Sequence, residues 1–277
     1  KEPRNKFCMN ALPTVKHIVA VASGKGGVGK STVAVNLALA LSKQGLRVGL
    51  LDADIYGPSQ SMMLGAEING SLEVVDELLL PVKLHGIETM SISFVSSDRT
   101  PAIWRGPMAS GAMEQLLTKT KWGQLDVLLV DMPPGTGDIQ LTLAQKVRVS
   151  GAIIVTTPQN VALLDARKGI EMFRRVSIPV IGIVENMSVY ICPECGHEDR
   201  VYGKGGGNSA SKEYDTLLLG EIPLNSKIRE CSDEGQPIFS EGSEKPLNEI
   251  FIKIADTVQK FLDSSSVSIP TLQISDD

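Results

Sequence analysis

A glycine-rich stretch with two lysines gives the strongest chemical signal in the sequence. Residues 22–32 read Ala-Ser-Gly-Lys-Gly-Gly-Val-Gly-Lys-Ser-Thr and fit the pattern G-x-x-x-x-G-K-S between an apolar run and a helix-like segment. Glycines let such a loop turn with positive φ, so that backbone N–H groups point at nucleotide phosphates. We predict that Lys30 offsets the charge of the β- and γ-phosphates and that the Ser31 hydroxyl binds Mg²⁺. The predicted nucleotide-binding residues of this loop are Gly24, Lys25, Gly26, Gly27, Val28, Gly29, Lys30, Ser31 and Thr32.

Two further apolar runs end in carboxylates. Asp52 and Asp54 follow one run, and Asp131 ends another. Ligands of open α/β sheets bind beyond the carboxyl ends of the strands, so these groups are expected on the nucleotide side, although solvated loop carboxylates are the alternative. A strand that ends in Asp131 is what a Walker B segment requires, and we predict that this carboxylate lies near the Mg²⁺ shell. The turn after it is glycine-rich, and the backbone N–H of Gly135 is a candidate sensor of the γ-phosphate.

A Cys-x-x-Cys pair, Cys192 and Cys195, is the second kind of chemical signal. A four-ligand metal site normally needs a second pair, and the remaining cysteines, Cys8 and Cys231, are isolated in the sequence. A two-fold dimer would bring two half-sites together and place four thiolates around one shared metal centre. His197 is either a ligand or a hydrogen-bonding neighbour, whereas Cys231 is expected in the core and Cys8 as a free thiol.

Apolar runs and helical periods alternate along the chain and are expected to position these residues. Repeated strand and helix indicate parallel βαβ units with right-handed crossovers. We therefore predict an α/β fold of three layers, a P-loop NTPase fold with a mostly parallel central sheet and helices on both faces. The predicted strands cover residues 15–23, 46–52, 126–131, 151–156, 179–185 and 217–222, and the predicted helices cover residues 29–44, 105–119, 138–147, 160–175 and 246–262.

The stretch after the second strand has a weaker pattern. We predict a surface excursion with short helices over residues 57–81, followed by strand pieces at 82–84 and 88–95. Trp104 and Arg105 are either functional residues or the start of a helix with a packed indole.

Composition favours one globular domain. The chain has 277 residues, of which 42% are apolar and 21% charged. The net charge of −5 leaves no evident basic face, which weighs against nucleic acid as a partner. No apolar run is long enough to predict a membrane span, and the few scattered cysteines fit a reducing compartment. We predict a flexible leader, one ATPase domain with a Cys-x-x-Cys insertion, and a disordered tail, at residues 1–14, 15–262 (insertion at about 188–203) and 263–277.

Together these stretches resemble the Mrp/NUBPL-type iron-sulfur carrier ATPases, which share a deviant Walker loop with MinD and the nitrogenase iron protein. The resemblance lies in the second loop lysine, Lys25, and in residues 104–107, 131–138, 172–176, 185–188, 220–224 and 233–237. It implies that Lys25 reaches the nucleotide of a partner subunit in a homodimer whose active sites face each other. It also implies that Asp54 orients or activates the attacking water, with Asp52 in support, and that Asn186 contacts adenine. The expected catalytic residues are Lys25, Lys30, Asp54 and Asp131.

The activity implied by this resemblance is slow ATP hydrolysis by a carrier of iron-sulfur clusters. Cys192 and Cys195 of two subunits are expected to hold a 4Fe-4S cluster, which is passed to apo iron-sulfur proteins. Residues 104–107 and 172–176 look most like the mitochondrial branch that serves respiratory complex I, which implies the mitochondrial matrix, with the cytoplasm as the alternative. ATP is favoured over GTP because no Asn-Lys-x-Asp guanine motif is visible.

Two other functional classes share parts of this pattern. A MinD/ParA-like positioning ATPase would bind membrane or DNA, and the last predicted helix has an apolar face formed by Leu247, Ile250, Ile254, Val258 and Phe261. Core packing explains that face better, because basic residues are few there, so at most peripheral membrane association is expected. A client-targeting ATPase with a structural zinc needs a long helical insertion, and residues 138–151 are too short for one.

Overall fold

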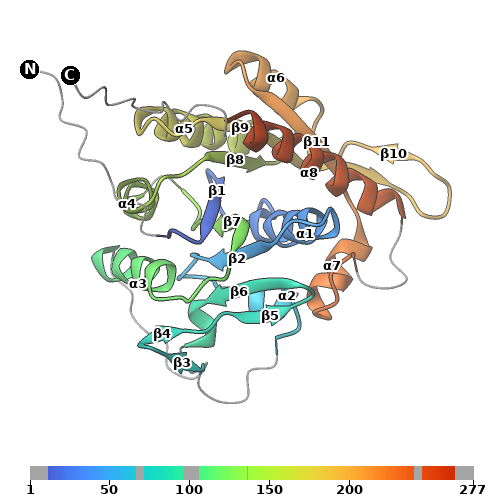
Figure 1. The fold of residues 1–277 in the computed structure, drawn as a ribbon. Coiled ribbons are helices and arrows are strands. Elements are labelled where there is room, and N and C mark those ends of the chain that lie inside the picture. The colour runs from blue at the N-terminus through green and yellow to red at the C-terminus, as the bar shows by residue number, and fades with distance from the viewer. Residues whose placement is uncertain (1–11, 67–71, 96–105, 136, 240–244, 266–277) are drawn as a thin grey trace, which may run out of the picture.

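The computed structural model describes residues 12–66, 72–95, 106–135, 137–239 and 245–265, and its centre is a nine-stranded sheet (Figure 1). The strand order is β10-β9-β8-β1-β7-β2-β6-β5, and β11 also pairs with β9. Within this sheet the pairs β5–β6 and β9–β10 are antiparallel, and the remaining pairs are parallel. The strands are β1 (Val15–Ser23), β2 (Val48–Asp52), β5 (Val82–Leu84), β6 (Ile87–Ser91), β7 (Leu125–Asp131), β8 (Gly151–Thr156), β9 (Val180–Ile191), β10 (Glu198–Asp199) and β11 (Leu217–Leu224).

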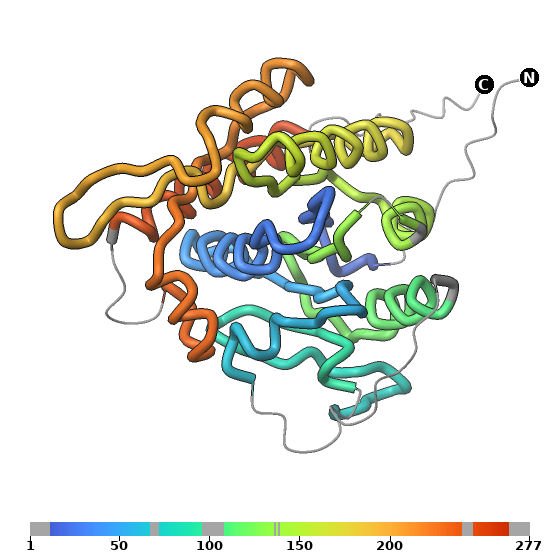
Figure 2. The backbone as a smooth tube through the Cα atoms, turned by 180° about the vertical axis from the view of Figure 1, so that it is seen from behind, coloured from blue at the N-terminus to red at the C-terminus, as the bar shows by residue number. Residues whose placement is uncertain are grey.

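Helices cover both faces of the sheet, which confirms the predicted three-layer α/β fold (Figures 1 and 2). One buried cluster joins the sheet to α3 (Gly106–Thr118), α4 (Asp138–Lys146) and α5 (Asn160–Arg175). A second joins the opposite face to α1 (Lys30–Lys43) and α8 (Lys245–Ser265). The parallel strands are nearly continuous apolar runs because both of their faces are buried.

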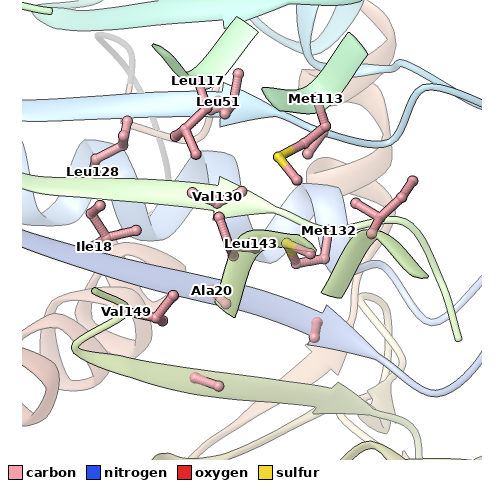
Figure 3. Packing of buried hydrophobic residues seen from close by; sticks show 14 of the residues in the cluster. Ile18, Ala20, Leu51, Met113, Leu117, Leu128, Val130, Met132, Leu143 and Val149 are labelled. Atoms are coloured by element: carbon pink, nitrogen blue, oxygen red, sulfur yellow. The ribbon is translucent and has the colours of Figure 1, made fainter. Parts of the chain in front are cut away.

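Interdigitated side chains fix the strands that carry the site (Figure 3). Leu51 of β2 and Val130 of β7, each next to a terminal aspartate, are fully buried against residues such as Met113 of α3 and Leu143 of α4. Each large apolar side chain buried in this way contributes roughly 1.5–3 kcal/mol. The strand ends that carry the carboxylates are therefore rigid.

The irregular region differs from its prediction in two places. Residues 57–66 contain the short helix α2 (Gln60–Met63), but β3 (Val74–Val75) and β4 (Leu78–Leu79) form a separate hairpin where only short helices were predicted. The strand predicted over residues 88–95 was wrong in its second half, because β6 ends at Ser91 and a 3-10 helix, Ile92–Phe94, follows. The Ser91 hydroxyl accepts a hydrogen bond from the Ser93 N–H and so starts that turn. Trp104 and Arg105 lie outside the described residues.

The C-terminal part contains elements that the sequence analysis did not predict. These are β10, α6 (Gly206–Glu213) and α7 (Ser226–Asp233), and β9 is six residues longer than predicted at its carboxyl end. Helix α8 continues to Ser265 and packs its apolar face on the sheet, with Leu247, Ile254 and Val258 buried, as the core-packing interpretation predicted. None of the helices in the described ranges is both long enough and apolar enough to cross a membrane.

Candidate functional site

The phosphate loop connects β1 to α1 at the carboxyl edge of the sheet. Gly27 and Gly29 have φ values of 79° and 80°, a region that favours glycine, and Gly29 is the N-cap of α1. Gly24 meets a different requirement, because a Cβ there would lie 2.2 Å from the backbone carbonyl carbon of Asp165 in α5. The loop therefore presents backbone rather than side chains at the start of a helix, as phosphate binding requires.

Lys30, the first residue of α1, binds the carboxylates of two neighbouring strands. Its Nζ lies 2.6 Å from Oδ1 of Asp131 and 3.5 Å from Oδ2 of Asp54, and its side chain is 6% exposed. It also donates to the Ser31 hydroxyl over 3.3 Å. The structure thus brings together four residues that the sequence analysis assigned to nucleotide chemistry. An arriving phosphate would compete with Asp131 for this ammonium group.

The three carboxylates at the strand ends are buried together. Asp131 is fully buried, and Asp52 accepts hydrogen bonds from the Asp54 N–H over 3.1 Å and from the Ser91 hydroxyl over 3.1 Å. Burial first, and the charge of Asp131 second, raise the pKa of Asp52 to about 7. Burial also raises the pKa of Asp54, although Lys30 opposes that shift. This cluster therefore holds more acidic groups than the nearby lysine can neutralise.

The donors available here fit a magnesium ion in kind. Carboxylate oxygens and the Ser31 hydroxyl are the hard ligands that Mg²⁺ prefers, and a divalent cation would offset the surplus of acidic groups. Within the described part of the chain, no three His, Cys, Asp or Glu side chains surround a single metal position. Nucleotide phosphates and waters would complete the octahedral shell, as is usual for this ion.

Two residues of the cluster were missed by the sequence analysis. Gln60 is 2% exposed, and its Nε2 donates to Oδ2 of Asp131 over 2.9 Å. Ser91 is 1% exposed and donates to Asp52. Ser91 ends a strand beside β2, so the strand-end rule could have found it once the strand order was known. Gln60 follows an irregular turn and gave no such signal.

Two other predicted residues, Lys25 and Gly135, differ in whether the group assigned to the nucleotide already makes a hydrogen bond within the protein. In the described ranges the Lys25 side chain makes no hydrogen bond or ion pair, and it is partly exposed, as expected of a group available to a partner. Gly135 has φ 97°, and its N–H donates to the carbonyl of Ser23 over 2.9 Å. The predicted role of that N–H as a γ-phosphate sensor therefore requires the hydrogen bond to Ser23 to break.

Asn186 connects β9 directly to the phosphate loop. Its Nδ2 donates to the carbonyl of Val28 over 2.8 Å, and its Oδ1 accepts the N–H of Met187. A Cβ at Gly29 would lie 2.2 Å from the same Nδ2, so this contact explains a second requirement for glycine there. The contact of Asn186 with adenine stays a prediction. Its hydrogen bond to the phosphate loop is a second role, which the sequence analysis did not predict.

The cysteine pair lies at the tip of a hairpin that projects from the sheet (Figures 1 and 2). We call residues 186–206 the cysteine hairpin. It contains the outer part of β9, the turn with both cysteines, and β10. The Cys192 N–H donates to the carbonyl of His197 over 3.0 Å, and the Gly196 N–H donates to that of Cys192 over 2.9 Å. His197 thus supports the turn through its backbone.

The two thiols at this tip are accessible and lie close to each other within the turn. Cys192 is partly exposed and Cys195 is exposed. Backbone N–H groups of Cys195 and Glu194 donate to the Cys192 sulfur and lower the pKa of its thiol. Cys231 is 6% exposed in α7 and belongs to the apolar core, as predicted. Cys8 lies outside the described residues. The hairpin therefore offers two soft ligands, which is half of a four-thiolate site.

The phosphate loop lies between a strand and a helix, and its lysine forms an ion pair with the aspartate that ends a neighbouring strand. This arrangement defines a P-loop ATPase. Residues 14–259 match the family model described as "ParA: NUBPL iron-transfer P-loop NTPase", and the chain belongs to that family.

Similar proteins agree with this assignment. An iron-sulfur cluster carrier protein of Pseudomonas fragi is 56% identical over 247 residues, which cover 89% of this chain and 86% of that protein. The iron-sulfur cluster transfer protein NUBPL of Mus musculus is 46% identical over 275 residues, covering 96% and 85%. A nucleotide-binding protein of Archaeoglobus fulgidus, solved with ADP, is 40% identical with a TM-score of 0.72, covering 82% and 89%.

Proposed function

We propose that this protein is an ATP-dependent carrier of iron-sulfur clusters. Two copies hold one 4Fe-4S cluster between them through Cys192 and Cys195 and pass it to apo iron-sulfur proteins. The observation that carries the proposal is the placement of two accessible thiols at the end of a strand that also contacts the phosphate loop. The names of the Pseudomonas and mouse relatives support the same cargo.

Ligand counting supports a homodimer. A 4Fe-4S cluster usually takes four thiolates, and one cysteine hairpin supplies two, so a two-fold axis through the tips completes the set. Lys25, whose side chain makes no hydrogen bond or ion pair in the described ranges, supports the proposal as the residue that reaches the partner's nucleotide. Neither nucleic acid nor a membrane is required as a partner.

The nucleotide chemistry is assigned to the residues of the carboxylate cluster. Lys30 binds the β- and γ-phosphates, and Asp131 and Ser31 support Mg²⁺. Asp54 orients or activates the attacking water, and Asn186 contacts the base. The supporting geometry is the pair of short distances from Lys30 Nζ to the carboxylates of Asp54 and Asp131.

The recipient is proposed at the level of apo iron-sulfur proteins in general. The mouse relative supports the narrower role in complex I assembly within the mitochondrial matrix. The bacterial carrier is more similar, at 56% against 46% identity, and it supports a general carrier in a cytoplasm. The balance of identity favours the general role over one confined to complex I.

Anaerobic reconstitution tests the proposal directly. The protein should bind one 4Fe-4S cluster per two chains, measured by iron and sulfide content and by visible absorption, and should activate an apo iron-sulfur enzyme. Colourless protein that holds stoichiometric zinc instead would support a client-targeting ATPase. Vesicle or DNA binding that depends on ATP, with no cluster formed, would support a positioning ATPase.

Substitution Asp54→Asn should separate nucleotide binding from hydrolysis. The amide still hydrogen-bonds a water but is a poorer base and lacks charge, so we expect hydrolysis to slow by about 10²–10⁴-fold. The melting-temperature shift caused by Mg-ATP should persist. Phosphate release in a single turnover measures the first effect. Asp76→Asn is a matched control, because Asp76 lies in the turn between β3 and β4 and its carboxylate pairs with Lys121 rather than with Lys30. Unchanged hydrolysis in Asp54→Asn would remove Asp54 from the reaction.

A further inference from the structure

Glu185 joins the two ends of the cysteine hairpin. It is fully buried in β9, and its Oε2 accepts the N–H of Gly207 in the first turn of α6. The chain between these two residues carries Cys192 and Cys195. One carboxylate thus closes a long projecting segment at its base, where a helix N-terminus favours negative charge.

Glycines at the start of α6 make this contact possible. Gly205, the N-cap, has φ 70°. A Cβ at Gly206 would lie 2.5 Å from Cδ1 of Leu163 in α5, and a Cβ at Gly207 would lie 3.0 Å from both the Cβ and the Oε2 of Glu185. The backbone of α6 therefore packs directly against α5 and Glu185. Side chains at these positions would force the two ends of the hairpin apart.

Both ends of the hairpin also contact the phosphate loop or its support. At the first end, Asn186 binds the Val28 carbonyl, one residue after Glu185. At the second end, Gly206 packs on Leu163 of α5, and the same helix packs its backbone at Asp165 against Gly24 of the loop. A movement of the phosphate loop would therefore act on both ends of the hairpin.

The environment of the other carboxyl oxygen, Oε1, indicates that Glu185 does more than fill space in the core. Its Oε1 is buried and accepts no close hydrogen bond among the described residues, and Glu221 lies opposite Glu185 in the β9–β11 register. Burial first, and the neighbouring Glu221 carboxyl with it, raise the pKa of Glu185. A buried unpartnered oxygen costs free energy, on the order of 1–3 kcal/mol. An apolar residue could fill the position without that cost, but it could not bind the α6 N–H.

We propose that Glu185 is a positioning residue that fixes the two ends of the cysteine hairpin as one unit, through which the nucleotide state of the phosphate loop controls Cys192 and Cys195. It acts on the thiols through the backbone and touches neither nucleotide nor cluster. The inference deepens the proposed carrier function and rests on it for its biological purpose. The coupling itself is measurable in cluster-free protein.

Thiol alkylation of the full, cluster-free chain tests the coupling. Rates for Cys192 and Cys195 are measured with N-ethylmaleimide and peptide mass spectrometry, without nucleotide, with Mg-ADP and with Mg-ATP. Wild type should show a nucleotide-dependent change of about fivefold or more, the lower range of common coupling. Glu185→Ala should reduce this change below roughly twofold while keeping the nucleotide-induced melting shift. Glu185→Gln should behave as wild type, because its amide oxygen still accepts the Gly207 N–H.

Two further variants keep the test decisive. Glu185→Asp retains a carboxyl group but withdraws it from Gly207 because the side chain is shorter, so it should lose the coupling even if Glu185→Ala does not fold. Glu213→Gln, in α6 and paired with Arg167, is the matched control and should retain the coupling. A wild-type dependence that persists in Glu185→Asp, or no dependence in wild type, would overturn the proposal. Intact coupling in wild-type protein that binds no cluster on reconstitution would refute the carrier function and leave this role for Glu185.

Discussion

Substituting either Cys192 or Cys195 by serine should leave a protein that binds Mg-ATP but holds no 4Fe-4S cluster after anaerobic reconstitution. Each substitution removes two of the four thiolates from a symmetric site, because both subunits carry the change. The thiols lie on a projecting hairpin, so the ATP-induced melting shift should persist. Iron and sulfide content, together with size-exclusion chromatography, measures the loss of cluster and of cluster-dependent dimer.

Cysteines elsewhere in the chain provide the controls for this experiment. Cys231→Ser changes a thiol of α7 that is buried in the apolar core of the domain, and the variant should retain the cluster. Cys8→Ser should retain it as well. The bridging arrangement would be refuted by a cluster in the Cys192→Ser, Cys195→Ser double variant, or by one complete cluster per monomer.

Lys30→Ala should have two large effects with different physical causes. Saturating Mg-ATP at ~100 times its dissociation constant stabilises a protein by roughly 2.7 kcal/mol, and the variant should lose most of that gain. The variant should also be less stable without nucleotide, by about 3–5 kcal/mol, because Asp131 would remain as a buried carboxylate without its cation. Thermal and denaturant unfolding with and without Mg-ATP separate these effects.

A double variant distinguishes the two effects of Lys30. Lys30→Met with Asp131→Asn removes both charges and keeps similar volumes, so it should regain much of the lost stability without nucleotide. It should still show no ATP-induced shift, because the phosphate partner is absent. An undiminished shift in Lys30→Ala would show that the loop does not bind the nucleotide phosphates.

The parts of the site that could be predicted are those encoded by local pattern. The phosphate loop needs glycines at fixed spacing, and the aspartate of β7 ends an apolar run, so Gly29 and Asp131 were both visible in the sequence. Gln60 and Ser91 reach the same carboxylates only because β6 lies beside β2 and α2 folds over the strand ends. Such contacts depend on strand order and on an irregular turn, neither of which has a periodic signal.

The contacts of Asn186 and the cysteine hairpin show the same limit. The adenine role of Asn186 came from resemblance, whereas its bond to the Val28 carbonyl depends on the distance between two loops far apart in sequence. The extension of β9 was missed because residues 186–191 lack an uninterrupted apolar run, and Met187 adopts φ 56° within the strand. Pairing with β10 and β11, rather than local preference, keeps these residues extended.

The length of β9 gives its two halves different resistance to local opening. The inner half lies between β8 and β11 in the buried sheet, where backbone amides open only with the whole domain. The outer end is paired with the two residues of β10 and is exposed to water, so it can open at little cost. One continuous strand thus spans nearly the full range of local stability in the molecule. If the proposed carrier function holds, Cys192 and Cys195, which follow this outer end, would exchange a cluster there without loosening the part of the sheet beside the phosphate loop.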